Sequence, residues 1–480
     1  MIKNERQYKI TKAQTDRFAK SLREIEKEQS NSNVHPILLK AQKEALKSQY
    51  DELLSEIRAY EALRAGDMNV LEVPSFSELP NALIQARIAL GLSQKELADK
   101  LAVKEQQIQR YEANNFANAS LTRIKQIIDA LGVRIKEELF LPQDPISLET
   151  LFDRLNALGI SKEFIVRRLL SQELASVMQD TATQTYDAVF RVASTVASVF
   201  DITTSNLLSN DTPNLNFLSV GSTRFKTSSY AEESKLKAYT IYANRLARAV
   251  LKATPNLKQS TVPTDPKEVR RAILDRYGRV VFETTLRYVW SLGIPVLPLN
   301  DAGTFHGACW RYEGRNIIVL KQQNMSLARW LYDLLHELRH TAEVPGEPSF
   351  AIIEDSPISP DRQESEDEEN ANYFAEDIIL DSKSDRLEEF CENESNGSLE
   401  KLKSAITRVA NREGVEVDSL ANHMAYRLSE EGQDWWGTAS NLQRNAPSPL
   451  DYARRILIEH LDLTYLGELE KRLLIRALED

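Results

Sequence analysis

Apolar residues recur at helical spacing near the start of the chain. From 11 to 65 the sequence is polar and charged, with an apolar stripe that includes Leu46, Leu53 and Ile57, and it is interrupted only at 31–36. This pattern predicts two amphipathic helices in a hairpin. Because a one-sided apolar helix pair needs a partner surface, we interpret residues 1–75 as an oligomerisation or docking hairpin.

A second helical pattern covers residues 76–142. Gly91 and a capping box formed by Ser93 and Glu96 punctuate it, and together they predict three short helices joined by tight turns. These helices are expected over 82–90, 94–101 and 104–113. Their order predicts a helix-turn-helix domain.

Beyond residue 142 the pattern is helical at both ends and mixed in between. Short β-branched or apolar runs at 280–282, 294–299 and 316–320 predict the strands of a small mixed sheet, and 345–369 is expected to be an acidic loop that contains prolines. The predicted fold is therefore mainly α (α+β). Its expected divisions are a hairpin (1–75), a helix-turn-helix domain (76–142), a helical connecting region (143–225), a sheet-containing domain (226–390) and a helical C-terminal region (391–480).

The composition of the chain mainly excludes certain classes of protein. The 480 residues are 42% hydrophobic and 27% charged, as in ordinary globular domains, and they include only two cysteines, Cys309 and Cys391. Two cysteines exclude a disulfide framework, so we expect a reducing, cytoplasmic location. The longest apolar run, 188–200, contains Arg191 and is too short to span a bilayer, so no membrane association is expected.

The net charge of −11 opposes DNA binding by the chain as a whole. Residues 80–135 differ, because they hold eight basic and five acidic residues and therefore carry a local charge of +3. This local excess suits contact with the phosphate backbone of DNA.

The predicted third helix presents polar side chains that can reach base edges and phosphates in the major groove. The string ARIALGLSQKELADKLAVKEQQIQRYEAN, followed by SLTRIKQIIDALGV, resembles the phage-repressor (Xre/Cro) type of helix-turn-helix. The resemblance implies double-stranded operator DNA as a partner, with Gln94 and Gln106 as the foremost contacts, and a homodimer suits a palindromic operator. A bundle used only for protein contacts is the alternative. The predicted DNA-binding residues are Ser93, Gln94, Lys95, Lys104, Glu105, Gln106, Gln109 and Arg110.

Residues 336–340 have the sequence H-E-L-R-H. Two histidines four residues apart share one face of a helix, so His336 and His340 can both bind one tetrahedral Zn²⁺. Glu337 lies where a general base can reach water at the metal without ligating it. A catalytic zinc needs a third protein ligand, and the acidic segment 364–369 offers Glu364, Glu368 and Glu369.

The same segment carries a family resemblance. H-E-x-x-H followed by E-x-x-A-N-x-F-A resembles the ImmA/IrrE-type metallopeptidases, and the upstream strings GIPVLPLN and FHGACWRYEGRNIIVL match the order of that family's strands, over roughly 230–380. The resemblance implies a zincin-like fold with Glu368 as the third zinc ligand. It also implies an endopeptidase that cleaves a specific partner protein, typically a repressor, in a phage, mobile-element or stress response. Arg339 departs from the small residue usual at its position.

Four other polar residues accompany the motif. Arg329 and Asp333 fall on the histidine face of the predicted helix and are expected to support or pack it. His306 and His423 are interpreted as structural histidines, with a place in the cleft or beside an oxyanion as the alternative.

Two functions compete. The first is a DNA-binding transcriptional regulator with a zinc metalloendopeptidase, in which Glu337 acts on a repressor or a toxin–antitoxin partner, as in phage defence. The second is a non-catalytic repressor or antitoxin-type regulator that uses the same fold as a sensor or binding module, and 56–61 resembles the leader of HigA-like antitoxins. Glu337 favours the enzyme, because a purely structural zinc site, a third possibility, needs ligands but no base.

Overall fold

The computed structural model describes most of the chain as two compact units, Met1–Phe140 and Leu141–Asp480. Mostly helical, with one small mixed sheet, it confirms the predicted fold class. The five predicted divisions stay predictions, and the two units are described separately. The described residues are 1–28, 36–65, 73, 76–135, 146–177, 186–209, 215, 230–303, 305–343, 347–354, 366–444 and 447–479.

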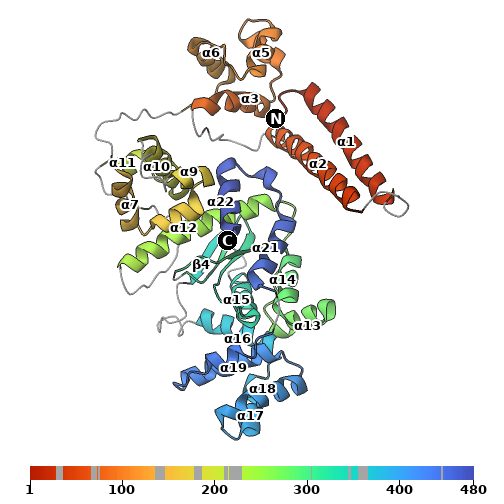
Figure 1. Cartoon of the computed structure of the whole chain (residues 1–480), viewed down its shortest axis with the longest axis vertical. Helices are drawn as coiled ribbons and strands as arrows, with labels where there is room; N and C mark the ends of the chain where they lie inside the picture. The colour runs from red at the N-terminus through yellow and green to blue at the C-terminus, as the bar shows by residue number, and fades with distance from the viewer. Residues whose placement is uncertain are drawn as a thin grey trace. The chain divides into compact units, whose positions relative to one another are not determined.

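The first unit consists of a long helical hairpin and a helix-turn-helix (Figure 1). Its helices are α1 (Glu5–Glu28), α2 (Pro36–Ala65), η1 (Phe76–Glu78), α3 (Leu79–Ala89), α4 (Gln94–Lys100), α5 (Glu105–Ala113) and α6 (Leu121–Leu131). The hairpin joins the core of the helix-turn-helix, because Ile57 and Tyr60 are buried in one cluster with Leu83 and Ile84. The apolar stripe of α2 thus finds part of its partner surface within the same chain.

The helix-turn-helix forms for local reasons that the sequence carries. The Ser93 hydroxyl accepts a hydrogen bond from the Glu96 backbone, and the Glu96 carboxylate accepts one from the Ser93 backbone, which confirms the predicted capping box. Gly91 adopts a φ of 69° after α3, a left-handed conformation that glycine takes without steric cost. Leu97 and Ile108 then pack into the core between the helices.

The second unit surrounds a four-stranded sheet with helices. Its helices are α7 (Leu148–Ala157), α8 (Lys162–Phe164), the π-helical turn η2 (Ile165–Leu169), α9 (Gln172–Val177), α10 (Tyr186–Phe200), α11 (Thr204–Leu208), α12 (Tyr230–Ala253), α13 (Pro266–Tyr277), α14 (Phe282–Ser291), α15 (Leu327–His340), α16 (Glu366–Leu380), α17 (Ser384–Ser395), α18 (Leu399–Glu413), α19 (Val417–Glu430), α20 (Trp436–Ser440), α21 (Pro449–His460), η5 (Leu463–Tyr465) and α22 (Glu468–Leu478). One hydrophobic cluster runs from Leu148 to Ala477, so the C-terminal helices share the core of the sheet.

The sheet has the strand order β1-β3-β2-β4. Its strands are β1 (Val296–Leu299), β2 (Gly307–Tyr312), β3 (Arg315–Lys321) and β4 (Phe350–Glu354). β1 pairs with β3 in parallel, and β2 lies antiparallel to both β3 and β4, so that Ala308 pairs with Val319 on one side and Ile353 on the other. The central strands are almost fully buried, which matches their nearly continuous apolar sequence.

Helix α15 lies against β2 and β3. Ser326 caps it by accepting a hydrogen bond from the Arg329 backbone. Its leucines are buried as predicted; they are Leu327, Leu331, Leu334, Leu335 and Leu338. Because the leucine face of the helix packs in the core, the orientation of the helix is fixed, and so is the position of the two histidines on its opposite face.

Two expectations about the connections are wrong. The run 280–282 forms no strand, because Val281 is instead the N-terminal cap of α14, which begins at Phe282. The segment 345–369 is not a continuous loop, because its apolar residues 350–353 pair with β2 as an edge strand and α16 begins at Glu366. Neighbouring prolines and acidic residues obscured a strand whose formation depends on its distant partner.

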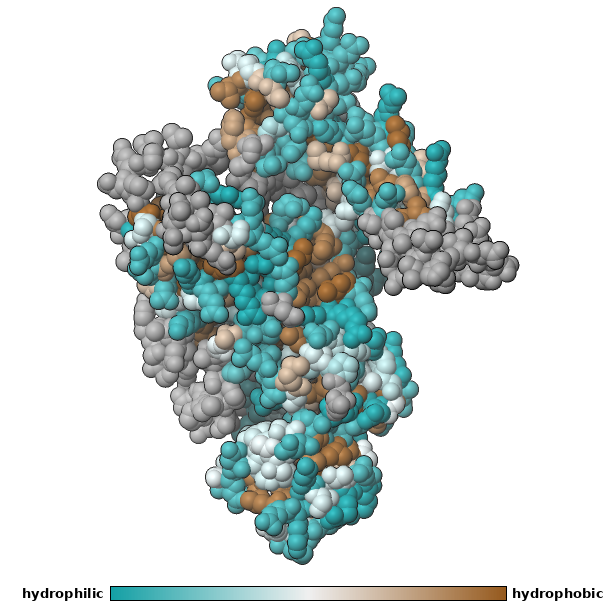
Figure 2. Space-filling view, viewed as in Figure 1, coloured by the Kyte–Doolittle hydropathy of each residue, from teal (hydrophilic) through white to brown (hydrophobic). Residues whose placement is uncertain are grey.

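The surface seen in Figure 2 is mostly hydrophilic, with apolar residues in separate patches. Both cysteines are buried and neither is in a disulfide. Among the described residues, no helix is both long and apolar enough to cross a lipid bilayer.

Candidate functional site

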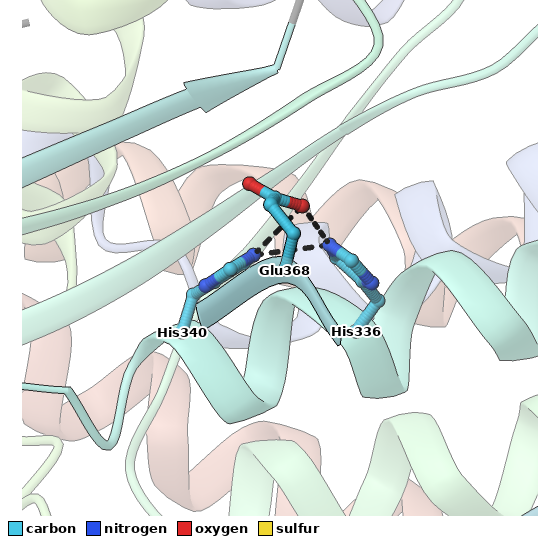
Figure 3. Close-up of side chains that lie close together, drawn as sticks. All are labelled: His336, His340 and Glu368. Carbon is cyan, nitrogen blue, oxygen red and sulfur yellow. Dashed lines mark hydrogen bonds and ion pairs between the residues drawn. The ribbon is translucent and has the colours of Figure 1, made fainter. Parts of the chain in front are cut away.

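Three side chains converge above α15. His336 and His340 rise from consecutive turns of this helix, and Glu368 reaches them from the first turn of α16 (Figure 3). The structure thus brings together the three residues predicted as metal ligands. Of the alternatives, Glu369 is solvent-exposed and absent from the cluster, and Glu364 lies outside the described residues.

The separations of the three ligand atoms suit a tetrahedral cation. The two histidine Nε2 atoms are 3.0 Å apart, and Glu368 Oε2 lies 3.3 Å from Nε2 of His336 and 3.9 Å from Nε2 of His340. Tetrahedral zinc with bonds of 2.0 to 2.1 Å needs ligand atoms about 3.3 Å apart. Two imidazoles and one carboxylate are also the donor types that zinc prefers, so these residues fit the ion.

Glu343 supports this cluster and was not predicted from the sequence. Its Oε1 lies 2.7 Å from Nδ1 of His340, the ring nitrogen that faces away from the other ligands. A carboxylate in this position sets the tautomer and the orientation of a ligating imidazole. The sequence feature that could have identified Glu343 is an acidic residue three positions after the second histidine, where the helix ends.

Glu337 lies beside the cluster in a space that a glycine provides. Its side chain is 1% exposed, and a Cβ added to Gly307 would lie 2.1 Å from Glu337 Oε1. No Cβ tolerates such a contact, so the first residue of β2 must be glycine for this carboxylate to keep its place. Burial and, secondarily, the charge of Glu337 raise the pKa of the neighbouring Cys309 thiol.

A buried lysine holds the chain that leads into β2. Lys321 Nζ donates hydrogen bonds of 2.8 Å to the Gly303 carbonyl and 2.7 Å to the Phe305 carbonyl. Burial lowers the pKa of Lys321 to about 8. These bonds fix the segment immediately before His306 and Gly307, and therefore the space that Glu337 occupies.

The cluster opens into a cleft of about 270 Å³. His306 and Gly307 line one part of it, as the alternative interpretation of His306 required. Asn372 and Glu376 of α16 line another part, and the Asn372 amide oxygen accepts a 2.6 Å hydrogen bond from Tyr332.

Helix α19 completes the cleft; the sequence predicted a place in the cleft or beside an oxyanion for His423 only as an alternative, and it did not predict the other lining residues of this helix. Asn422, His423 and Tyr426 all line it. His423 Nε2 lies 2.7 Å from Glu388 Oε1, and this hydrogen bond holds the pKa of Glu388 below its usual range. The predicted helix-supporting pair also lies in this cleft, where Arg329 and Asp333 form an ion pair of 3.1 Å.

Seven of the eight predicted DNA-binding residues are exposed on the helix-turn-helix. They are Ser93, Lys95, Lys104, Glu105, Gln106, Gln109 and Arg110. Within this set, Gln109 Nε2 donates a 2.9 Å hydrogen bond to Glu105. The outward face of α5 is therefore exposed and can enter a groove of DNA, as predicted.

Gln94 differs, because it turns inward and is 8% exposed. Its Nε2 donates a 2.7 Å hydrogen bond to Glu112, which also forms a buried ion pair of 2.6 Å with Arg87. Gln94 is thus bound within the module, and a contact of its side chain with DNA stays a prediction that requires this network to open.

The model of the helix-turn-helix family matches residues 83–137. This match includes α4 and α5 and supports a DNA-binding regulator, as the sequence predicts. No curated protein and no solved structure matches the chain.

Proposed function

We propose that this helix-turn-helix regulator carries a zinc-dependent endopeptidase that cleaves a specific partner protein, such as a repressor or a toxin–antitoxin partner. The observation that carries the proposal is the convergence of two histidines and one glutamate beside a carboxylate that a glycine accommodates. A site that only binds a metal does not need a buried carboxylate held beside its ligands. A general base needs this arrangement, because it must be held at a defined distance from the reacting water.

In this proposal His336, His340 and Glu368 hold the ion, and Glu343 orients His340. Bound zinc supplies a Lewis acid for the scissile carbonyl and lowers the pKa of a coordinated water. Glu337 accepts a proton from the attacking water, whose oxygen forms a bond to the carbonyl carbon. Glu337 then gives this proton to the amide nitrogen as the C–N bond breaks, which yields a carboxylic acid and an amine.

The cleft residues position the substrate in this scheme. Amide and hydroxyl groups along α16 and α19 offer hydrogen bonds to a peptide backbone, and Asn422 lies among them. In this proposal His423, which is held by Glu388 and lines the same wall, donates to the carbonyl oxygen as it gains charge.

The first experiment measures bound zinc by mass spectrometry on the full-length chain. We expect about one zinc per chain in the wild type, and a loss of zinc in His336→Ala and in Glu368→Ala. Glu369→Ala is the matched control, since it removes an exposed carboxylate next to the proposed ligand and should keep the metal. A wild type without zinc, or indifference of zinc to Glu368, would refute the metal site.

The second experiment separates enzyme from sensor. Protein N-termini are compared between cells that express the wild type and cells that express Glu337→Gln. New termini that depend on Glu337, with zinc and DNA binding unchanged in the variant, support the endopeptidase. If zinc binds and the regulatory phenotype is indifferent to Glu337→Gln, the chain is a non-catalytic repressor or antitoxin-type regulator instead.

A further inference from the structure

The region of helix α1 has an excess of positive charge that its partner helix α2 does not share. Residues 1–28, up to the end of α1, contain eight lysines and arginines and five acidic residues, a net charge of +3 in a chain of −11. The positive charge is concentrated in residues 1–23, which hold seven of the basic and only two of the acidic residues. The partner helix α2 (Pro36–Ala65) is neutral, with five basic and five acidic residues. The excess of positive charge therefore belongs to α1 and not to the hairpin as a whole.

The basic residues of α1 share one side of the helix. At 100° per residue the six basic residues from Arg6 to Arg23 occupy about 140° of the circumference, and all six are exposed. We call this surface the basic stripe; it consists of Arg6, Lys9, Lys12, Arg17, Lys20 and Arg23. Among the α1 residues whose side chains the structure describes, the same sector holds two acidic residues, Glu5 and Asp16, and Glu5 is paired with Arg64 of α2 at 2.7 Å. Thr11 and Thr15 are buried on the opposite side.

The start of α1 is fastened to the helix-turn-helix. Lys3 Nζ donates hydrogen bonds of 2.6 Å to the Glu112 carbonyl and 2.9 Å to Asn115, where α5 ends. The Lys3 carbonyl accepts a 2.6 Å bond from Arg87, and Asn4 Nδ2 lies 3.5 Å from Gln94, where α4 begins. Because α2 is also buried against the same core, the end of the basic stripe at Arg6 lies next to the helix-turn-helix, and the rest of the stripe extends along α2.

We propose that the basic stripe of α1 binds the phosphate backbone of the DNA that the helix-turn-helix occupies, and so extends its contact along the duplex. This proposal rests on the DNA-binding part of the function and not on the peptidase. From Arg6 to Arg23 the stripe is about 26 Å long, which corresponds to about seven or eight base pairs. A rigid row of lysines and arginines of this length complements a polyanion, and it contributes affinity without sequence preference.

The test uses the full-length chain and a mixed-sequence duplex of 24 base pairs, with binding measured by fluorescence anisotropy over a range of salt concentrations. The variant Lys9→Gln/Arg17→Gln removes two charges from the stripe. The matched control, Lys47→Gln/Arg58→Gln, removes two exposed charges from α2. Both have the same net charge.

If both stripe residues contact phosphates, the salt slope of the association constant becomes shallower by about 1.8, and affinity at 0.15 M salt falls about 30-fold. The control pair should retain a wild-type slope, because in the proposed complex no phosphate lies within a Debye length of about 8 Å of these two side chains. Equal thermal unfolding midpoints establish that both variants are folded. Should Lys9→Gln/Arg17→Gln unfold, Arg6→Gln/Arg23→Gln replaces it, with the same expected change.

The outcomes distinguish this proposal from DNA binding by the helix-turn-helix itself. Wild-type slope and affinity in the stripe variant would overturn the role of α1 and leave the helix-turn-helix in place. An equal loss in the control pair would also overturn it, because net charge would then explain the effect. A wild type that binds no duplex would overturn both. Retained DNA binding with lost binding to vesicles of anionic lipid would assign the stripe to a membrane surface and refute the proposal.

Discussion

A single added methyl group tests whether Gly307 positions the proposed general base. In Gly307→Ala the new Cβ would lie 2.1 Å from Glu337 Oε1 and 3.0 Å from its Cδ. Contacts under 3.0 Å essentially never occur, so Oε1 must move by about 0.9 Å. Gly307 has no positive φ, and the substitution therefore acts through this contact and not through backbone strain.

A displacement of this size should have a small effect on the stability of the fold and a large effect on the rate of catalysis. The atom that yields is the far end of a side chain, so we expect a loss of at most about 1 to 3 kcal/mol in the free energy of unfolding, as for modest overpacking. A reacting group that is misplaced by about 1 Å can cost about 100-fold in rate, or about 2.7 kcal/mol in activation free energy. Zinc content should stay at the wild-type level, because the three atoms nearest to the new methyl group all belong to Glu337 and none to a ligand.

The assay measures three properties of one preparation: bound zinc, the thermal unfolding midpoint, and the rate of cleavage of the partner protein identified by its Glu337-dependent terminus. Gly437→Ala is the matched control, because a Cβ there meets nothing within 4 Å although the neighbouring Trp436 lines the same cleft. In the Glu337→Gln background, Gly307→Ala should cause no further loss of cleavage, since both changes act on one group.

Two results would refute this reasoning. Wild-type cleavage by Gly307→Ala, with Glu337→Gln inactive, would mean that the glycine does not position the carboxylate. Loss of zinc together with activity would mean that the strand has moved, and the defect would then belong to the metal site.

Three further predictions concern single side chains. Glu343→Gln should lower zinc affinity about 10- to 100-fold, measured by competition with a chromogenic chelator, because its carboxylate orients His340 at 2.7 Å. Glu112→Ala should destabilise the first unit by about 3 to 5 kcal/mol, measured by hydrogen exchange on the full chain, because it leaves the charge of Arg87 buried and unpaired. Lys321 releases its proton near pH 8 in the folded state and near 10.4 when unfolded, so stability relative to Lys321→Met should rise by about 1 kcal/mol from pH 8 to 9.

Each of these predictions has a control or a contrary outcome. Unchanged zinc affinity in Glu343→Gln would contradict the orienting role of that carboxylate. Glu105→Ala removes an exposed glutamate from the same helix as Glu112, and hydrogen exchange of α3 and α5 should be unaffected by it. A difference between wild type and Lys321→Met that is constant from pH 8 to 9, or that falls, would contradict the lowered pKa of the buried lysine.

Local signals predicted the helix-turn-helix closely. The capping box at Ser93 and the turn at Gly91 are satisfied within a few residues, so the sequence contains all of their partners. The same holds for His336 and His340, whose common face follows from the helical repeat alone. β4 was missed for the opposite reason, because its hydrogen-bond partners in β2 lie some forty residues away.

The sequence by itself determined the two chemistries: a helix-turn-helix with a basic local charge, and a pair of imidazoles next to a carboxylate on one helix. Only the tertiary structure decided that Glu368 rather than Glu369 meets the histidines, that Gly307 makes room for Glu337, and that α19 closes the cleft. It also decided that Gln94 turns toward Glu112. The physical reason is range: helical periodicity and capping act over a few residues, whereas these contacts depend on how distant segments pack around one core.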